Sequence, residues 1–290
     1  MSSHIPHHPY GALERGSYAR QIVRAGEASE VDADFVVPVY NEQAELGSSI
    51  MILKEKLENI TANDRGFSWQ IVIADNASTD ETWNVASALV DAFPEAVRAL
   101  KIPEKGRGRA LKIAWSESQA LARAYMDVDL STDLDLVGEL VNPILDGTAD
   151  LCFGSRLMEG AQVTRTAKRE TISRTYNRML QTYLDVGFRD AQCGFKAISA
   201  MAAEALLPYV EDNEWFFDTK LLVLAERLGI ATHEFPVRWV EDPGSTVNII
   251  DTARKDLRGM KRIKGTRPAS GARRRSTIGP SITPRKETIR

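Results

Sequence analysis

Short apolar runs alternate with longer amphipathic segments through the first half of the chain, and this alternation limits the possible folds more than any other feature. The runs with the length of buried strands are 34–40, 70–75, 97–102, 123–127 and 150–154. The segments with apolar side chains at helical spacing are 43–60, 80–92, 108–122 and 134–145. Strands that alternate with helices form a mostly parallel sheet with helices on both faces. The sequence therefore predicts a single α/β, Rossmann-like domain.

The second half departs from this regular alternation. Its predicted elements are a helix over 167–186, a strand over 194–199, a helix over 214–228 and a strand over 233–239. With these elements the domain is expected to span residues 32–248.

The two ends of the chain have a different composition. Residues 1–31 lack apolar periodicity and are predicted to be flexible. A basic amphipathic helix is predicted over 249–264, and residues 265–290, rich in Arg, Ser, Pro and Gly, are predicted to be disordered. The segment 252–290 carries a net charge of +11, so the rest of the chain carries −14 within the total of −3. A basic tail on an acidic body predicts an anionic surface as partner.

Composition also limits the compartment. Two cysteines, Cys152 and Cys193, form neither a disulfide framework nor a zinc pattern, which is typical of the reducing cytosol. No segment approaches the roughly 18–20 apolar residues needed to span a bilayer. The first residues lack the charged and apolar regions of a signal peptide. The sequence predicts a cytoplasmic protein.

Asp127 and Asp129 flank Val128 at the end of the predicted strand 123–127. Residues i and i+2 of a strand point to the same face, so these carboxylates repel each other unless a cation lies between them. Mg²⁺ or Mn²⁺ takes oxygen ligands and commonly bridges to a substrate phosphate. For an isolated motif of this kind, two solvated loop aspartates would be the better interpretation. Agreement with other segments favours a metal site.

Polar motifs follow several of the predicted strands, and ligands of open parallel sheets bind beyond the carboxyl ends of the strands. The motifs are Pro38-Val-Tyr-Asn-Glu42, Asp75-Asn-Ala-Ser-Thr-Asp80, Gly106-Arg-Gly-Arg-Ala110 and Asp127-Val-Asp129. In order and spacing they resemble the N-terminal half of the family 2 glycosyltransferases. This resemblance implies the GT-A fold, a nucleotide-sugar donor, and Mg²⁺ or Mn²⁺ as cofactor.

The resemblance also implies roles for single residues. The residues implied to hold the nucleoside are Pro38, Tyr40, Glu42 and Asp75. Gly106 and Gly108 would let backbone amides approach the diphosphate. Arg107, where relatives commonly have Lys, would neutralise it. Val128 belongs to the same donor-binding set, and Asp127 and Asp129 would hold the metal.

Other interpretations of these motifs remain open, and two positions depart from the family pattern. Ser78–Asp80 can simply cap a helix, and Arg107 and Arg109 can form a solvated basic turn. Asn76-Ala77 replaces the common Asp-Gly. Ser131 stands where some relatives have a Gln two residues after the second aspartate, so Ser131 is not counted among the metal ligands.

Motifs in the second half of the chain narrow the resemblance to one branch of the family. Its strings are Gly154-Ser-Arg156, Arg169 with Ser173-Arg174, Asp190-Ala-Gln-Cys-Gly-Phe-Lys196, Trp215-Phe-Phe-Asp218, Val237-Arg-Trp239 and Gly244-Ser245. In this order they resemble the polyprenyl-phosphate branch, which includes dolichyl-phosphate β-glucosyltransferases and dolichol-phosphate mannosyltransferases. The likeness covers residues 34–258. It implies transfer to a polyprenyl phosphate, with UDP-glucose favoured as donor and GDP-mannose or a UDP-N-acetylhexosamine open.

Cations in the second half can bind the acceptor phosphate. The candidates are Arg156, Arg169 and Arg174, and the alternative for each is a helix surface paired with acids. Asp190 and Gln192 complete the predicted catalytic set with Asp127, Asp129, Arg156 and Arg169. As an alternative, Asp190, Gln192 and Lys196 can form a buried polar strand junction. Asp218 is expected to orient either a sugar hydroxyl or an arginine.

A lipid acceptor requires a membrane surface. The apolar positions of the predicted basic helix are Ile249, Ile250, Ala253, Leu257 and Met260. Such a helix can lie in the headgroup layer of an anionic membrane, or its apolar face can pack on the domain. We expect the protein at the inner face of the cell membrane, either held by its tail or by a separate transmembrane partner.

Three other functions compete with this interpretation. A GT-A transferase that acts on a saccharide or other hydroxyl would need a base, and the Arg-rich second half argues against it. A nucleotidyltransferase would need a Gly-rich basic loop where Tyr40-Asn41-Glu42 stands. A nucleic-acid binder would fit the basic run Arg273–Arg275 but not the acidic body.

Overall fold

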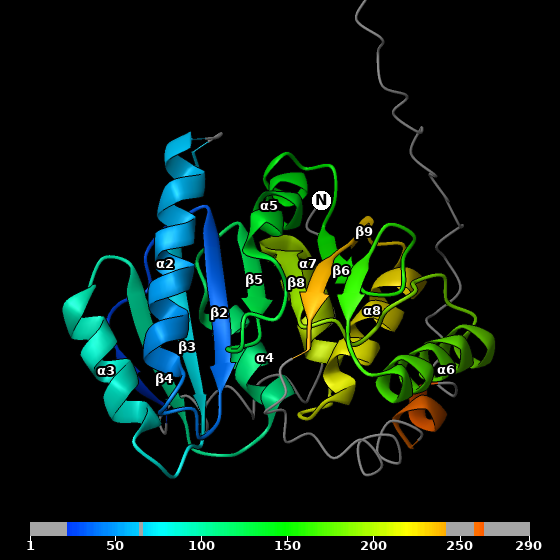
Figure 1. The fold of residues 1–290 in the computed structure, drawn as a ribbon, viewed down its shortest axis with the longest axis horizontal. Coiled ribbons are helices and arrows are strands. Elements are labelled where there is room, and N and C mark those ends of the chain that lie inside the picture. The colour runs from blue at the N-terminus through cyan, green and yellow to red at the C-terminus, as the bar shows by residue number, and fades with distance from the viewer. Residues whose placement is uncertain (1–21, 64–65, 242–257, 264–290) are drawn as a thin grey trace, which may run out of the picture.

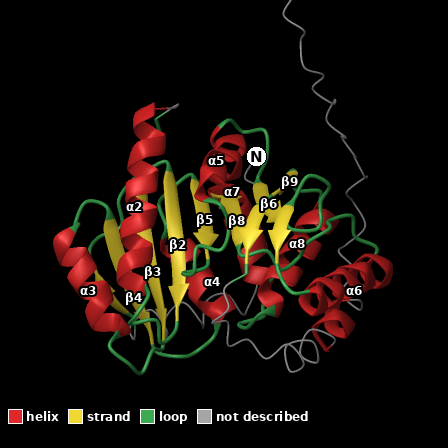
Figure 2. Cartoon of the chain, in the orientation of Figure 1, coloured by secondary structure: helices red, strands yellow, loops and turns green. Residues whose placement is uncertain are grey.

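One eight-stranded sheet forms the centre of the protein, and helices cover both of its faces (Figures 1 and 2). The structure, a computed structural model, describes residues 22–63, 66–241 and 258–263. The strands, in their spatial order, are β1 (Val23–Ala25), β4 (Val97–Ile102), β3 (Trp69–Asn76), β2 (Ala33–Val39), β5 (Ala122–Met126), β8 (Phe195–Ser199), β6 (Leu151–Ser155) and β9 (Thr232–Pro236). A separate pair is formed by β7 (Gln162–Thr164) and β10 (Arg238–Val240).

The four strands β4, β3, β2 and β5 pair in parallel, as the alternation of strands and helices predicts. β8 runs antiparallel to both of its neighbours, β5 and β6, and β9 pairs in parallel with β6. The predicted mostly parallel α/β sheet is confirmed. Figure 1 shows that the parallel strands point the same way, so their carboxyl ends meet at one edge of the sheet.

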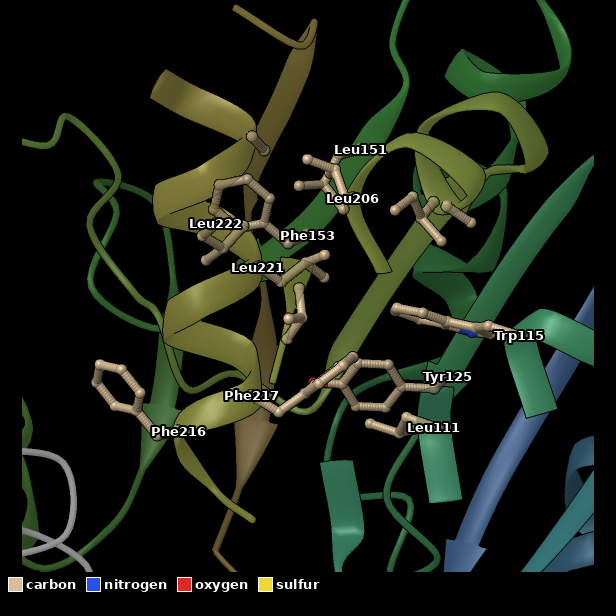
Figure 3. Packing of buried hydrophobic residues seen from close by; sticks show 14 of the residues in the cluster. Leu111, Trp115, Tyr125, Leu151, Phe153, Leu206, Phe216, Phe217, Leu221 and Leu222 are labelled. Carbon is tan, nitrogen blue, oxygen red and sulfur yellow. The ribbon is translucent and has the colours of Figure 1, made fainter. Parts of the chain in front are cut away.

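Successive side chains of each strand point to opposite faces, and both faces are buried. Phe35 and Val37 of β2 pack in one cluster with α2 (Leu46–Asn63), α3 (Thr82–Ala92) and α5 (Val137–Leu145). Val36 packs in the other. The helices of that second cluster are α4 (Arg107–Glu117), α6 (Ala167–Leu184), α7 (Ala200–Leu206) and α8 (Phe216–Leu228). Figure 3 shows its aromatic centre, where the Trp115 ring centroid lies 5.8 Å from Tyr125 and 5.9 Å from Phe217.

Several boundaries differ from the sequence prediction for local reasons. The helix expected over 108–122 ends at Glu117, because the Ser118 hydroxyl accepts the Ala120 N–H and forms a turn. The strand expected over 233–239 splits in two, since Pro236 has no N–H to extend the ladder, and residue 238 pairs with β7 instead. β1, β7 and α7 were not predicted; β1 pairs antiparallel with β4 at the edge of the sheet.

The described part of the predicted C-terminal helix packs on the domain. Residues 258–263 are helical, and Met260 and Ile263 are buried in the core cluster that contains Phe216. For Met260 the structure therefore supports packing on the domain and not insertion into a membrane. The other apolar positions of this predicted helix, Ile249, Ile250, Ala253 and Leu257, lie outside the described residues. Within the described ranges, no helix has both the length and the hydropathy to cross a bilayer.

Candidate active site

The motifs that follow the parallel strands come together at the carboxyl edge of the sheet. β2 lies between β3 and β5, with Val39 opposite Asp75 and Val36 opposite Tyr125. The loop after β2, the end of β3 and the Asp127 motif after β5 are therefore neighbours. This is the edge at which ligands bind in open parallel sheets.

Hydrogen bonds join the first two motifs into one unit. Asn41, in a left-handed conformation at φ 57°, donates its N–H to Ser78 Oγ at 2.9 Å. In return, its Oδ1 accepts the Thr79 N–H at 2.8 Å. The Glu42 N–H donates to Thr82 Oγ1 at 2.8 Å at the start of α3. The segment Ser78–Asp80 thus ties the loop after β2 in place.

Asp75 keeps one oxygen without a protein partner. The residue is fully buried, and its Oδ1 accepts the Ser78 N–H at 2.9 Å. Its Oδ2 is buried and has no hydrogen-bond partner. A buried acceptor without a donor is costly, so such a group in a native protein requires an explanation. A ligand N–H or O–H group would satisfy it.

Asn76 and Ala77 replace the common Asp-Gly of the family pattern, and Asn76 has a structural role. Asn76 Oδ1 accepts the N–H of Gly106 at 2.6 Å and so fixes the start of the glycine-rich loop. Ala77 adopts a left-handed conformation at φ 61°, which glycine adopts more readily. The common glycine of the family pattern thus corresponds to a real backbone requirement that alanine meets with strain.

Both glycines of the loop are needed for packing. A Cβ on Gly106 would lie 2.6 Å from the Asn213 carbonyl oxygen, and one on Gly108 would lie 2.5 Å from Phe217 Cβ. The loop therefore lies against the segment that leads into α8. Next to it, the Lys105 ammonium lies 3.3 Å from the centroid of the Tyr40 ring and joins the loop to the first motif.

A row of alternating charges connects this loop to the core. Arg107 donates from Nη2 to Asp127 Oδ1 at 2.8 Å and from Nη1 to Asp218 Oδ2 at 2.7 Å. Lys196, fully buried, lies 3.0 Å from Asp218 Oδ1, which also accepts the Tyr125 hydroxyl. Of the two expectations for Asp218, the structure supports the orientation of an arginine.

Ionisation within this row follows from its contacts. Burial raises the pKa of Tyr125 well above its usual value, and Asp218 raises it further, so the phenol stays neutral. Burial alone would raise the pKa of Asp218, but Lys196 and Arg107 hold it below its usual value. The pKa of Arg107 is raised despite burial, because Asp127 and Asp218 surround it.

The two predicted metal ligands lie at the open end of this row. The Asp127 side chain is 42% exposed, and Asp129, also exposed, accepts the Ser131 N–H at 3.0 Å. Both line a small hollow whose wall includes Gly194 and Trp239. A Cβ on Gly194 would lie 1.8 Å from Asp127 Oδ2, so only glycine leaves the carboxylate its place.

These side chains fit a hard divalent cation in chemistry but do not form a complete cage. Carboxylate oxygens are the ligands that Mg²⁺ and Mn²⁺ prefer. Among the described residues, no group of three or more His, Cys, Asp or Glu side chains could hold a metal ion. Asp127 and Asp129 would therefore share such an ion with ligand or water oxygens. Val128 between them is buried in the core, so only its backbone would be available to a ligand.

Arg156 is held in place by Asp190. Its Nε and Nη2 donate to the two carboxylate oxygens of Asp190 at 2.7 and 2.9 Å, and its backbone N–H donates at 3.0 Å. Burial alone would raise the pKa of Asp190, but Arg156 lowers it to about 2. The guanidinium also lies 5.4 Å from the Trp239 ring centroid. Asp190, fully buried, thus positions Arg156 and does not itself face solvent.

The other predicted phosphate-binding cations are paired with acids. Arg169, near the start of α6, contacts Glu241 at 2.5 Å, and Arg174 pairs with Glu170 one turn earlier on the same helix. Both match the alternative of a paired helix surface. Gln192 places its backbone N–H 3.2 Å from Asp190 Oδ1.

The sequence matches glycosyl transferase family 2 over residues 34–207. The chain belongs to this family. Similar proteins include glycosyltransferase AglD of Haloferax volcanii, 35% identical over 81% of this chain and 37% of that protein. The dolichyl-phosphate beta-glucosyltransferase of Dictyostelium discoideum is 28% identical over 79% of this chain and 72% of that protein. The dolichyl-phosphate beta-glucosyltransferase of Saccharomyces cerevisiae is 27% identical over 89% of this chain and 85% of that protein.

Solved structures of another glycosyltransferase share the fold. Glucosyl-3-phosphoglycerate synthase from Mycobacterium tuberculosis, in complex with Mn²⁺, UDP and phosphoglyceric acid, superposes with a TM-score of 0.56 at 18% identity, covering 83% of this chain and 81% of that chain. The complex of the same enzyme with phosphoglyceric acid alone superposes with a TM-score of 0.57, covering 86% of this chain and 85% of that chain. The predicted GT-A fold and membership in glycosyl transferase family 2 are confirmed, and with them the class of enzyme. The chain spans little more than a third of AglD.

Three residues of this candidate site were not given a role by sequence reasoning. Tyr125 lies two positions before Asp127, so strand periodicity could have placed it on the same face. Trp215 has its ring centroid 4.9 Å from the Arg107 guanidinium, and it was recognised only as part of a motif. Lys105 precedes the glycine-rich loop, but its contact with Tyr40 depends on how two distant loops fold.

Proposed function

We propose that this protein is an inverting glycosyltransferase that moves a hexose, with glucose favoured, from a nucleoside diphosphate sugar to a polyprenyl phosphate. The names of its relatives from Dictyostelium and yeast support the acceptor and the sugar. The observation that carries the proposal is the unsatisfied oxygen of buried Asp75 at the same sheet edge as Asp127. A ligand that spans both needs a hydrogen-bond donor at one end and anionic oxygens at the other.

A nucleoside diphosphate sugar has these features. A base with an N–H group, such as uracil, can donate to Asp75 Oδ2. Pro38, Tyr40 and Glu42 lie on the adjacent strand end and loop, where they would contact the nucleoside. Arg107 and Lys105 bring positive charge to the loop that would face the diphosphate.

A divalent cation fits the carboxylates of Asp127 and Asp129, which would hold it beside the diphosphate. When bound, Mg²⁺ or Mn²⁺ supplies electrostatic stabilisation of the charge that develops on the leaving nucleotide. In the free protein Arg107, itself bonded to Asp218, holds Asp127 through its Oδ1.

On the acceptor side, Arg156 is a cation that Asp190 has already oriented, so little side-chain entropy is lost when it binds a phosphate. The acceptor phosphate attacks the anomeric carbon from the face opposite the nucleotide, which inverts the configuration. Because the phosphate is already anionic, the main tasks are alignment and stabilisation of the leaving group, and a strong base is not essential. Arg169 would assist if Glu241 released it.

A polyprenyl acceptor requires access to a membrane. We infer that the protein acts at the cytoplasmic face of a membrane, held there by its basic tail or by a separate transmembrane protein. The net charge of +11 over residues 252–290 supports an attraction to anionic lipid.

The test is transfer of labelled sugar by the purified full chain. UDP-glucose, GDP-mannose and UDP-N-acetylglucosamine are each incubated with polyprenyl phosphate and Mn²⁺, and lipid is extracted into organic solvent. We expect label in the lipid from UDP-glucose. Asp127→Asn should lower the rate at least 100-fold while circular dichroism still shows a folded protein, whereas Asp91→Asn, exposed near the end of α3, should not lower the rate. Label in no lipid product with any donor would refute the proposal.

A further inference from the structure

The four charges from Lys196 to Asp127 form a row with a net charge of zero. Lys196 lies 3.0 Å from Asp218, Asp218 lies 2.7 Å from Arg107, and Arg107 lies 2.8 Å from Asp127. The first three side chains are 0%, 4% and 10% exposed, while Asp127 is 42% exposed. Only the last member of the row is therefore readily accessible to a ligand.

The row balances only while Asp127 belongs to it. If a cation takes the carboxylate of Asp127, two buried cations, Arg107 and Lys196, share the single carboxylate of Asp218. An uncompensated buried charge is strongly unfavourable. Tyr125 cannot correct the balance, because its hydroxyl remains a neutral donor to Asp218. Arg156 is nearby but already neutralised by Asp190.

We propose that Arg107 is an exchange residue that couples metal binding to nucleotide binding. It holds Asp127 in the free protein and opposes a metal there; once the metal takes Asp127, its freed N–H groups and unbalanced charge bind the diphosphate. This inference rests on the proposed function, because it requires a nucleoside diphosphate as ligand. Each ligand then strengthens the binding of the other, as linkage demands.

The geometry of the arginine suits an exchange. Its two terminal nitrogens have separate partners, so Nη1 keeps Asp218 while Nη2 changes partner. The rings of Trp215 and Tyr125, with centroids 4.9 and 5.0 Å from Cζ, confine the guanidinium while this happens. A lysine, with one nitrogen, would contact both carboxylates less well, so Arg107→Lys should weaken the coupling without abolishing nucleotide binding.

The test measures Mn²⁺ binding to the full chain with and without UDP, by electron paramagnetic resonance of free Mn²⁺, corrected for the Mn·UDP complex in solution. In the wild type we expect UDP to tighten Mn²⁺ binding about 10-fold or more, within the usual range of coupling. Arg107→Met should bind Mn²⁺ alone several-fold more tightly than the wild type. UDP should tighten its Mn²⁺ binding by a smaller factor than in the wild type, because only diphosphate oxygens on the metal then couple the two ligands. This variant should fold, because Asp218 keeps Lys196 and Tyr125 as partners.

Arg24→Met is the matched control. It also removes a guanidinium that is paired with a carboxylate, that of Glu117, but in the edge strand β1, separated from β5 by β4, β3 and β2. It should match the wild type in both measurements. Weaker or unchanged Mn²⁺ binding by Arg107→Met, with its coupling intact, would overturn the exchange while leaving the proposed function standing. A wild type that binds neither UDP nor GDP at any Mn²⁺ concentration would overturn both.

Discussion

The carboxyl ends of β2 to β5 and the segment from β6 to β10 are both rich in charged and polar side chains, but they use them differently. At the first region, Asp75 keeps an unsatisfied oxygen, the Asp127 side chain is 42% exposed, and Asp129 is exposed. At the second, the three predicted phosphate ligands already have carboxylate partners: Arg156 with Asp190, Arg169 with Glu241 and Arg174 with Glu170. The first region is open to ligands, whereas the second consists of cations whose positions are set before an acceptor arrives.

Gly194 breaks this division, since it belongs to the second region but serves the first. In Gly194→Ala the new Cβ would meet Asp127 Oδ2 at 1.8 Å, so the carboxylate must leave its position. We expect a loss of transfer rate on the order of 100-fold, comparable to the loss of a catalytic electrostatic contact. Gly187→Ala is the control, because its Cβ meets only Glu226 at an ordinary 3.6 Å. Equal rates for the two variants would show that Asp127 does not need this position.

Asp190→Asn tests whether the second region is built from fixed pairs. Breaking the buried pair leaves Arg156 without its carboxylate, which should lower the free energy of unfolding by about 3 kcal/mol. The pKa of Asp190 is lowered from 3.8 to about 2 in the folded protein, so the stabilisation is present above pH 3.8 and is lost as the pH falls toward 2. Urea unfolding of both proteins from pH 7 to pH 3 should show a difference in the free energy of unfolding that is constant down to about pH 4. Below that pH the difference should shrink. A difference that grew on acidification would contradict the pairing.

Arg169 and Arg174 lie on the same helix, α6, so their variants can be compared directly for an effect on acceptor binding. Arg174→Gln removes a surface pair of α6 and should change the Michaelis constant for the acceptor less than twofold. Arg169→Gln should raise it several-fold and leave the constant for the nucleotide sugar unchanged, if Arg169 leaves Glu241 for the phosphate. Identical kinetics for the two variants would assign both arginines to the helix surface.

Ala77 gives the smallest expected effect and concerns stability in the first region. Ala77→Gly relieves a left-handed backbone at φ 61° and should stabilise the domain by about 1 kcal/mol, or roughly 2–4 °C in melting temperature. Ala88→Gly, at an exposed position inside α3, should act in the opposite direction, since glycine costs about 0.5–1 kcal/mol in the middle of a helix. A lower melting temperature for Ala77→Gly would mean that the strain at this position is negligible.

The two regions also differ in how far the sequence predicts them. Parallel strands bring their carboxyl ends to one edge, so the motifs after β2, β3 and β5 could be placed together from order and periodicity alone. Charge pairing could not be predicted in this way. The Arg107–Asp218 contact joins residues 111 positions apart, and the Arg169–Glu241 pair depends on β10 leaving the main sheet after Pro236. Local pattern determines where a side chain lies, but only the packed structure determines its partner.

In the proposed reaction, a sugar leaves a nucleotide at the first region and passes to a phosphate held at the second. The most direct test gives the wild-type protein labelled UDP-glucose with Mn²⁺ and offers, in separate reactions, a polyprenyl phosphate and the corresponding polyprenol. We predict glucosylation of the phosphate at a rate at least 100-fold above that of the alcohol, because no base is required for an anion to attack. Equal labelling of the alcohol, or label found only in water-soluble products, would contradict transfer to a bound phosphate.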